Sequence, residues 1–445
     1  MEEDKELGRV LELNGALRDI AQRWVWAEDW NEEEAWGLRE EAILLNHKRY
    51  FRSISAYRAL VEDAGMDEDV TDMEAIKTDL MFATDIFKSY DPALVDNGDW
   101  EQMTAWLRTV YSGDLPGDYS NVKGLAEWIE KLAQDELHIL TSSGTSGQYS
   151  FVPRDMNTRM NLTMNSAQVF QPFFARVLEN ISEYDAAIMN FKGGSAGVQA
   201  ASNSIASIVQ NSYCLYDMEM PADAVRILQR GPRNAEEEKF LEEFERVMTT
   251  EKDLRYEVML DNIRTSLKDG QKILMQSTCY QLKELCTKAI QQGGLPLPEG
   301  SVLLFGGGWK TFEGEKITKA DLLELVDGAF GLRGESAVEG YSMIEMNTMM
   351  TCCSESRFHI PPFMEPVIFD EDLMPKPGAG ERGIFGFLDP FALSYPGFLI
   401  SGDEINLWHG ECACGRKGYA IDGEIQRVAG KEVKGCGGIM ASVKA

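Results

Sequence analysis

The chain of 445 residues is 44% hydrophobic and 26% charged, which is typical of a folded globular protein and excludes a disordered chain. Its length predicts two or three lobes, or one large α/β domain with appendages. The chain has 73 acidic and 43 basic residues, and the resulting net charge of -30 disfavours a general role in binding nucleic acid or anionic membranes. Any phosphate ligand must therefore be held locally.

The predicted elements divide the chain into three parts. Residues 1–135 have apolar positions at helical spacing, which indicates a helical N-terminal lobe. In residues 136–360 strands alternate with helices, and the runs "KILMQST" and "SVLLFGGGW" resemble parallel strands that deliver loops to one edge of a sheet, where ligands bind. Residues 361–445 contain short strands with Pro/Gly turns and predict a small β subdomain with a short tail. The expected fold class is α/β.

The termini and cysteines indicate the compartment. The N-terminus lacks the basic and apolar blocks of a signal peptide, and no window reaches the roughly eighteen apolar residues that a membrane span needs. The 8 cysteines are unevenly spaced, as reduced thiols or metal ligands are. We expect a cytoplasmic protein without a membrane span.

The stretch "LTSSGTSGQYSFVPRD", residues 140–155, separates two predicted strands. Its backbone N–H groups and hydroxyls suit phosphate oxygens. It is not a Walker A loop, because no lysine follows its second glycine. A plain Ser/Gly turn remains the alternative from these residues alone. The candidate phosphate ligands are Thr141, Ser142, Ser143, Gly144, Thr145, Ser146 and Gly147.

Four later motifs follow this loop in order: "LLFGGGWK" at 303–310, "EGYSMIEMN" at 339–347, "YPGFLISGDEINL" at 395–407 and "DGEIQRVAGKEVKGCG" at 422–437. Together with the loop they resemble the adenylate-forming superfamily, whose members make acyl-AMP from ATP and a carboxylic acid. The resemblance implies that superfamily's large N-terminal domain, with mixed sheets flanked by helices and a small β subdomain. It also implies ATP and Mg²⁺ as cofactors.

The resemblance assigns roles to individual residues. Tyr341 would stack near adenine, Glu345 would help to place magnesium, and Asp403 would bind the ribose hydroxyls. Arg427 corresponds to the hinge arginine, although Gln426 stands where a glycine is usual. Gly307 and Gly308 of the "LLFGGGWK" motif complete the expected set of nucleotide-binding residues.

Within the superfamily the sequence resembles the LuxE-type acyl-protein synthetases, on "GGGWK...GEKI", "HIPP", "SYPGFL", "CACGRKG" and "EVKGC". This resemblance implies activation of a fatty acid, acyl transfer to Cys436, and delivery to an acyl reductase partner. A thiolate is a strong nucleophile, and nearby lysines lower its pKa. The alternative for Cys436 is a small buried residue in a strand of the tail.

The usual mobile C-terminal domain, which carries an assisting lysine, is expected to be absent. The candidates for the missing positive charge are Lys310, Arg416, Arg427, Lys431 and Lys434, and the sequence does not choose among them.

A second cysteine group suggests a metal. Cys353 and His359 precede Cys412 and Cys414, and three thiolates with one imidazole complete a tetrahedral zinc site. Phenylacetate-CoA-ligase-like members of the superfamily have a similar arrangement, which implies a structural Zn²⁺. Cys352 remains an alternative to Cys353, and unliganded thiols remain an alternative to zinc.

Two rival functions stay open from the sequence. One is an acyl- or aryl-CoA ligase, and the other is a nucleotide-binding scaffold without turnover. The substrate is expected to be a small-molecule carboxylic acid, and the sequence is compatible with an oligomer.

Overall fold

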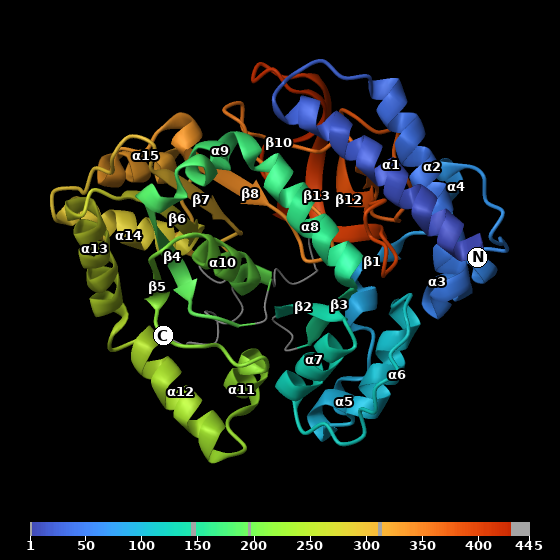
Figure 1. Cartoon of the computed structure of the whole chain (residues 1–445), viewed down its shortest axis with the longest axis horizontal. Helices are drawn as coiled ribbons and strands as arrows, with labels where there is room; N and C mark the ends of the chain where they lie inside the picture. Colours follow the sequence, from blue (N-terminus) through green and yellow to red (C-terminus); the bar gives the residue numbers. More distant parts are fainter. Residues whose placement is uncertain (1, 144–147, 195–196, 310–313, 429–445) are drawn as a thin grey trace. The chain divides into compact units, whose positions relative to one another are not determined.

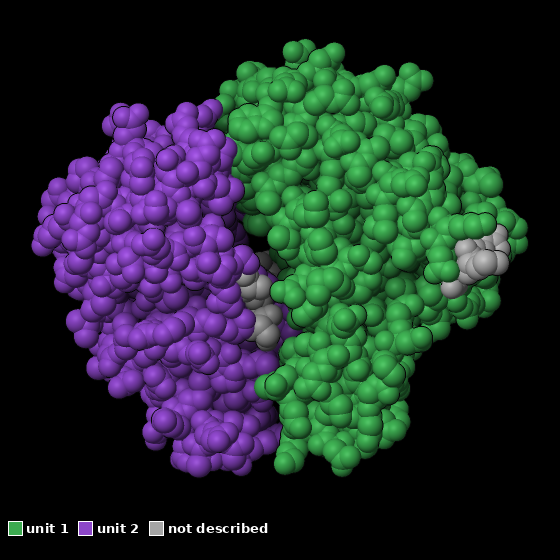
Figure 2. All heavy atoms as spheres, viewed as in Figure 1, with its two compact units in different colours: residues 1–140, 150–172, 342–432 green, residues 141–149, 173–341, 433–445 purple. Residues whose placement is uncertain are grey.

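The computed structural model describes residues 2–143, 148–194, 197–309 and 314–428 (Figure 1). They form two compact units (Figure 2). Unit 1 contains the described parts of 1–140, 150–172 and 342–432, and unit 2 contains those of 141–149 and 173–341. The expected segments 1–135, 136–360 and 361–445 are continuous, whereas these units are not, because strands from distant segments pair with one another. The α/β fold class is confirmed.

The helices of unit 1 begin where their sequences provide caps. The Asn31 side chain accepts a hydrogen bond from the Glu34 backbone at the start of one helix, and the Asp155 side chain accepts one from Thr158 at the start of another. The helical segments are α1 (Glu2–Val25), α2 (Glu32–Ser53), α3 (Ser55–Asp63), α4 (Met73–Asp79), η1 (Thr84–Lys88), α5 (Pro92–Asn97), α6 (Trp100–Val110), α7 (Leu125–Gln134) and α8 (Met156–Val169).

A sheet of seven strands forms the other half of unit 1, with the central order β10-β14-β13-β12-β11. Neighbours in this order are antiparallel, while β1 adds in parallel to β13 and β15 pairs with its middle. These strands are β1 (Phe82–Ala83), β10 (Arg357–His359), β11 (Glu365–Phe369), β12 (Arg382–Leu388), β13 (Phe398–Glu411), β14 (Lys417–Asp422) and β15 (Gln426–Arg427), and the short β9 (Met350–Thr351) precedes β10.

Unit 2 is built on a parallel sheet in which β5, β4, β6, β7 and β8 are neighbours in that order. β4 is buried along almost its whole length, as expected for a parallel strand that is covered on both faces. Its elements are α9 (Gln171–Glu179), η2 (Ile181–Glu183), β4 (Tyr184–Phe191), α10 (Gly197–Ile208), β5 (Ser212–Tyr216), α11 (Ala224–Arg230), α12 (Ala235–Met248), α13 (Lys252–Lys268), β6 (Lys272–Thr278), α14 (Cys279–Gln291), β7 (Val302–Gly306), α15 (Lys319–Phe330), η4 (Gly334–Ser336) and β8 (Ala337–Tyr341).

The chain leaves unit 1 within β2 (His138–Ser143) and re-enters it within β3 (Tyr149–Arg154). These two strands form a two-stranded sheet. Residues 144–147, between these strands, lie outside the described residues. Among the helices that the structure describes, none is long and apolar enough to cross a membrane.

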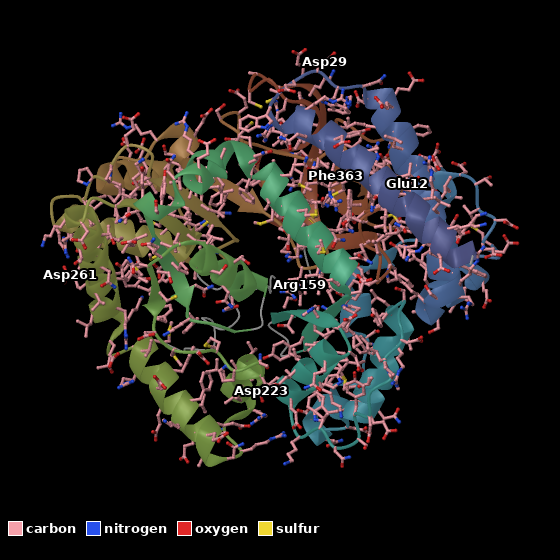
Figure 3. All side chains as sticks on the ribbon, viewed as in Figure 1. Glu12, Asp29, Arg159, Asp223, Asp261 and Phe363 are labelled. Carbon is pink, nitrogen blue, oxygen red and sulfur yellow. The ribbon has the colours of Figure 1, made fainter. Side chains whose placement is uncertain are left out.

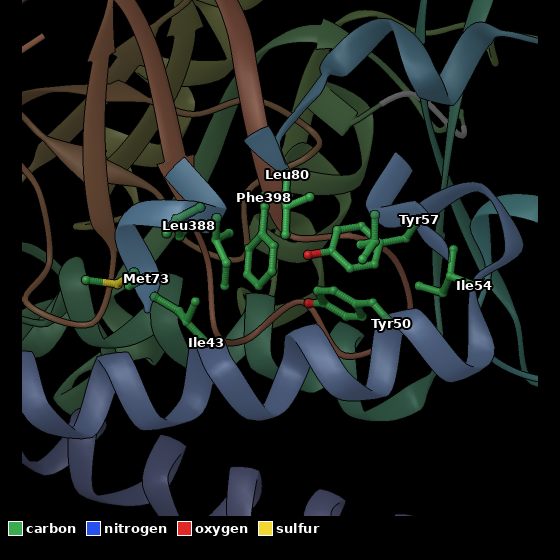
Figure 4. Packing of buried hydrophobic residues seen from close by; sticks show 10 residues of the cluster. Ile43, Tyr50, Ile54, Tyr57, Met73, Leu80, Leu388 and Phe398 are labelled. Carbon is green, nitrogen blue, oxygen red and sulfur yellow. The ribbon is translucent and has the colours of Figure 1, made fainter. Parts of the chain in front are cut away.

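One apolar cluster joins the N-terminal helices to the C-terminal strands within unit 1 (Figure 4). The rings of Tyr50 and Tyr57 lie against Phe398 at centroid distances of 5.2 and 5.9 Å. The cluster comprises Ile43, Tyr50, Ile54, Tyr57, Val61, Met73, Ile76, Leu80, Leu388 and Phe398, all at most 1% exposed. The N-terminal helices therefore share a hydrophobic core with β12 and β13.

A buried ion group connects the same parts. The Arg39 guanidinium and the Lys77 ammonium both contact the Glu365 carboxylate, at 2.5 and 2.8 Å. Arg39 lies on α2, Lys77 on α4 and Glu365 at the start of β11. Removing one partner of such a buried pair leaves an uncompensated charge, so these contacts fix how the helices lie on the sheet.

Replacing Phe398 with alanine is expected to lower the free energy of unfolding by about 3 to 5 kcal/mol, because a fully buried aromatic side chain is lost from the shared core. Leu11→Ala is the control, since Leu11 is 41% exposed, and its effect should stay within about 0.5 kcal/mol. Urea unfolding followed by tryptophan fluorescence measures both. Equal effects of the two substitutions would contradict the shared core.

Candidate functional site

Asp403 and Arg427 come together through strand pairing. They are register partners where β15 lies against β13, and Arg427 Nη1 is 3.1 Å from Asp403 Oδ1. Asp403 is buried, while Arg427 keeps about a third of its side chain exposed. The sequence separated these residues, and the antiparallel register joins them as an ion pair.

Gly402 makes room for this pair. A Cβ atom at Gly402 would lie 2.9 Å from Arg427 Nη1, so a larger residue would displace the guanidinium. Gly402 of the "SGDE" motif thus leaves room for the Arg427 guanidinium beside the strand backbone.

Glu345 lies close enough to this pair to be affected by its charges. Burial raises the pKa of Glu345 to about 7, while the positive charges of Arg154 and Arg427 oppose the rise. Desolvation disfavours the ionised carboxylate in a site with little water. Glu345, Asp403 and Arg427, which were predicted separately from three motifs, therefore lie near one another in unit 1.

Arg154 is a charged residue of this site that sequence reasoning did not assign. It is the last residue of β3, 1% exposed, and its guanidinium contacts the Asn347 side chain and lies 5.2 Å from the Tyr395 ring centroid. A basic residue at the end of an otherwise buried strand was the available signal, because such a charge requires a partner.

The other nucleotide-binding candidates lie in unit 2. Tyr341 ends β8, and Gly307 follows β7 with φ of +80°, a conformation that favours glycine. β7 and β8 approach closely here, since a Cβ at Gly306 would lie 2.4 Å from the Gly340 carbonyl oxygen. Because the carboxyl ends of parallel strands share one edge, Gly307, Gly308 and Tyr341 lie at the same edge of this sheet, which is the edge where such sheets commonly bind ligands.

The phosphate-loop candidates are only partly described. Thr141, Ser142 and Ser143 end β2, with Thr141 buried and Ser142 half-buried. The remaining candidates of the loop, Gly144, Thr145, Ser146 and Gly147, lie outside the described residues.

Several other sequence candidates lie outside the described residues or away from the carboxylates. Cys436, Lys310, Lys431 and Lys434 are outside the described residues. Arg416 donates to Thr351 Oγ1 at 3.2 Å and lies over the Trp24 ring, beside the cysteine group. Arg159 of α8, which is labelled in Figure 3, contacts His138 at the start of β2, and burial lowers the pKa of His138.

The four predicted metal ligands do come together. Their ligand atoms all lie within 4.8 Å of one another, with Cys353 Sγ 3.9 Å from Cys412 Sγ and Cys414 Sγ 3.2 Å from His359 Nε2. His359 ends β10, and the two later cysteines occupy the turn between β13 and β14. Of the two adjacent cysteines it is Cys353 whose sulfur lies in the cluster, while Cys352 pairs through its backbone with Phe358.

Burial and hydrogen bonds set the protonation of this cluster. Burial lowers the pKa of His359 to about 3, which keeps the imidazole neutral. Burial by itself raises the pKa of Cys412, but hydrogen bonds from the Cys414 backbone and from Arg357 lower it below its usual value. Burial raises the pKa of Cys414 to about 12. A neutral imidazole with three sulfur atoms is the donor set of structural zinc sites.

Comparisons with known proteins bear on the fold and the family of this chain. One similar solved structure is 2-hydroxyisobutyryl-CoA ligase in an open conformation with 2-HIB-AMP and CoA. It is 14% identical with a TM-score of 0.51, and the match covers 91% of this chain and 76% of that chain. The fold is therefore that of the adenylate-forming enzymes. The family profile described as "Acyl-protein synthetase, LuxE" matches residues 123–444, and the chain belongs to this family.

Two curated relatives are long-chain-fatty-acid–luciferin-component ligases. The protein of Vibrio harveyi is 25% identical over 193 residues, which is 42% of this chain and 49% of that protein. The protein of Aliivibrio fischeri is 26% identical over 102 residues, which is 23% of this chain and 27% of that protein. The matches thus span about half, or less, of these relatives.

The raised pKa of Glu345 predicts that stability falls as pH rises from about 4.5 to about 7. In this window the folded state keeps a proton that the unfolded chain has already released, and the difference corresponds to about 3 kcal/mol. Glu345→Gln removes this decline, because glutamine has no proton to release. Urea unfolding of both proteins at about pH 4 and about pH 8, without nucleotide, measures the effect.

Burial also raises the pKa of Asp389. Because the wild type and Glu345→Gln both contain Asp389, its contribution to the pH dependence of stability cancels when the two are compared. An identical pH dependence of the two proteins would show that Glu345 is not desolvated.

Proposed function

We propose that the chain activates a carboxylic acid, of the fatty-acid class, with ATP, and then transfers the acyl group to Cys436. The observation that carries this proposal is the convergence of Glu345, Asp403 and Arg427 in one largely buried group. Membership of the acyl-protein synthetase family and an adenylate-forming fold support it. The fatty-acid class follows from the names of the two curated relatives.

The first step is an in-line displacement at the α-phosphorus of ATP. A carboxylate oxygen of the acid forms the new P–O bond, the bond to the β-phosphate oxygen breaks, and pyrophosphate leaves with that electron pair. Mg²⁺, when bound, neutralises charge on the phosphates, and the Glu345 carboxylate would hold it. Asp403 would accept hydrogen bonds from the ribose hydroxyls, and its ion pair with Arg427 fixes the orientation of its carboxylate.

The second step moves the acyl group to sulfur. The thiolate of Cys436 attacks the acyl carbon, a thioester C–S bond forms, and AMP leaves with the electron pair of the former C–O bond. A thioester keeps the acyl group activated, which suits delivery to a reductase partner. The name of the Vibrio harveyi relative pairs a long-chain fatty acid with a luciferin component. This name fits an acyl group that is passed on to a second protein.

Zn²⁺ is proposed as a structural ion at Cys353, His359, Cys412 and Cys414, whose donor atoms already lie within 4.8 Å of one another. When bound, the ion would neutralise thiolate charge and join β10 to the turn between β13 and β14. Arg357 donates to Cys412 Sγ at 3.7 Å and would stabilise a coordinated thiolate from outside the coordination sphere.

Release to coenzyme A is the second candidate. It is favoured by the likeness to 2-hydroxyisobutyryl-CoA ligase, whose structure holds CoA. The two candidates differ in whether turnover requires an added thiol.

The function is tested by incubating the protein with Mg-ATP and a radiolabelled long-chain fatty acid. We expect pyrophosphate release without added coenzyme A and stable labelling of the protein. Cys436→Ser should abolish stable labelling but leave pyrophosphate release, because the first step does not use the thiol. Cys214→Ser is the control, since Cys214 is a half-buried cysteine outside both groups.

Labelling that persists in Cys436→Ser would contradict the acceptor assignment. Turnover that strictly requires coenzyme A would instead support the second candidate, and a lack of pyrophosphate release with every acid would contradict both.

Elemental analysis of gently purified protein is expected to find about one zinc ion per chain. Cys414→Ser should lose the zinc and lower the midpoint of thermal unfolding, because a coordinated thiolate is removed. Cys286→Ser is the matched control, since Cys286 is buried outside the cluster and should retain zinc. Absence of zinc from the wild-type protein would contradict the proposal.

A further inference from the structure

Glu345 lies in an irregular segment between β8 and β9, so its position depends on contacts from other parts of unit 1. Three consecutive carbonyl oxygens of this segment accept hydrogen bonds from two side chains. Arg154 Nη2 donates to the oxygens of Ile344, at 2.6 Å, and Met346, at 2.9 Å. The Tyr395 hydroxyl donates to the oxygen of Glu345 itself, at 2.8 Å. The backbone on both sides of Glu345 is therefore held.

The two donors also support each other. The Arg154 guanidinium lies 5.2 Å from the centroid of the Tyr395 ring, and its Nη1 contacts the Asn347 side-chain oxygen. A planar guanidinium presents several donors in a fixed geometry, which a lysine ammonium cannot reproduce. The arrangement thus depends on the shape of the guanidinium as well as on its charge.

Asn347 connects these donors to a buried carboxylate. Its backbone N–H and its side-chain Nδ2 both donate to Asp389 Oδ2, at 2.9 and 3.0 Å. Nδ2 also donates to the Tyr395 hydroxyl at 3.0 Å. Arg154, Asn347, Asp389 and Tyr395 are all fully or almost fully buried. Water does not compete for these hydrogen bonds, so each one restrains the segment strongly.

The position of Arg154 in the chain connects the Glu345 segment to the strand that follows the phosphate-loop candidates. It ends β3, the strand that follows the phosphate-loop candidates, whereas Glu345 belongs to a motif almost two hundred residues later. A buried arginine needed only for packing would find acceptors anywhere nearby. Here the hydrogen bonds of Arg154 and Tyr395 converge on the carbonyls that flank one acidic side chain.

We propose that Arg154 and Tyr395 are positioning residues for Glu345, which they hold in place for acyl-adenylate formation. The inference rests on the proposed function for its catalytic consequence. Neither residue needs to touch a substrate, because both act through the backbone of the segment that carries Glu345. Preorganised groups lower the barrier because they do not have to reorient as charge develops.

The main test is Tyr395→Phe, which keeps the ring beside Arg154 but removes the hydroxyl bonded to Glu345. Tyr184→Phe is the matched control, because the Tyr184 hydroxyl also donates to a backbone carbonyl, that of Gly300, at the same 2.8 Å but lies in unit 2. Both variants lose one hydrogen bond from a tyrosine hydroxyl to a backbone carbonyl, and Tyr395→Phe also loses the bond that Asn347 Nδ2 donates to the hydroxyl. Tyr395→Phe is therefore expected to lower the thermal midpoint at least as much as Tyr184→Phe.

Amide hydrogen exchange gives a readout that does not depend on activity. In this segment the Asn347 amide donates to Asp389 and the Met346 amide to the Met343 oxygen. Tyr395→Phe should speed exchange in the peptide containing residues 343–348, while Tyr184→Phe should leave that peptide unchanged. Unchanged exchange in Tyr395→Phe would overturn the inference, whatever the protein's activity.

The kinetic arm uses pyrophosphate release. Tyr395→Phe should lower kcat about tenfold, with KM for the acid unchanged, and raise the Mg²⁺ concentration needed for half-maximal rate. Tyr184→Phe should leave all three values near those of the wild type. Equal kinetic changes in both variants would reduce Tyr395 to a structural role and overturn the proposal.

Arg154→Lys gives an independent check, since it keeps the buried charge but not the planar donor geometry. It should lower kcat at least as much as Tyr395→Phe and also speed exchange in residues 343–348. Wild-type kcat in Arg154→Lys would contradict the role of the guanidinium. If the wild-type protein releases no pyrophosphate, the proposed function fails, whereas the exchange experiment still decides the positioning role.

Discussion

The pairing of β13 with its neighbours is the constraint on which the rest of unit 1 depends. At its start Phe398 enters the core shared with the N-terminal helices, and in its middle Asp403 meets Arg427 of β15. Its end leads into the turn that carries Cys412 and Cys414 opposite His359. From Asp403 to Leu407 buried and partly exposed residues alternate. A slip of one residue would turn Asp403 to the opposite face, so the hydrogen-bond ladder fixes both groups at once.

Buried charge is the second organising feature. Glu365 is matched by Arg39 and Lys77, and Arg154 lies in a network with Asn347 and Asp389. Such groups contribute little net stability compared with apolar packing, but leaving one partner unpaired is strongly destabilising. They therefore favour one arrangement of segments that are distant in sequence. This arrangement keeps Glu345, Asp403 and Arg427 of the candidate nucleotide site close together, with both carboxylates largely shielded from water.

The sequence proposed residues for the candidate sites but did not identify the side chains that hold them in place. Glu345, Asp403 and Arg427 were found because their motifs are local, and so were Cys353, His359, Cys412 and Cys414. Arg154 and Tyr395 stand in quoted motifs, but no role was assigned to them because their partners are carbonyl oxygens, which every residue has. The extents of the three expected segments followed from local periodicity. The two units are discontinuous because β1 and β13, which are more than three hundred residues apart, pair directly.

The sequence by itself determined the α/β class, the membership of the acyl-protein synthetase family, and the residue types available for nucleotide and metal chemistry. These features are local, since periodicity and motif spacing depend on neighbours in the chain. Tertiary structure alone decided that Arg427 pairs with Asp403, that Cys353 rather than Cys352 joins the metal-ligand cluster, and that Arg154 holds the segment of Glu345. These contacts depend on strand register and on the burial of charge, and both are settled only when distant segments pack together.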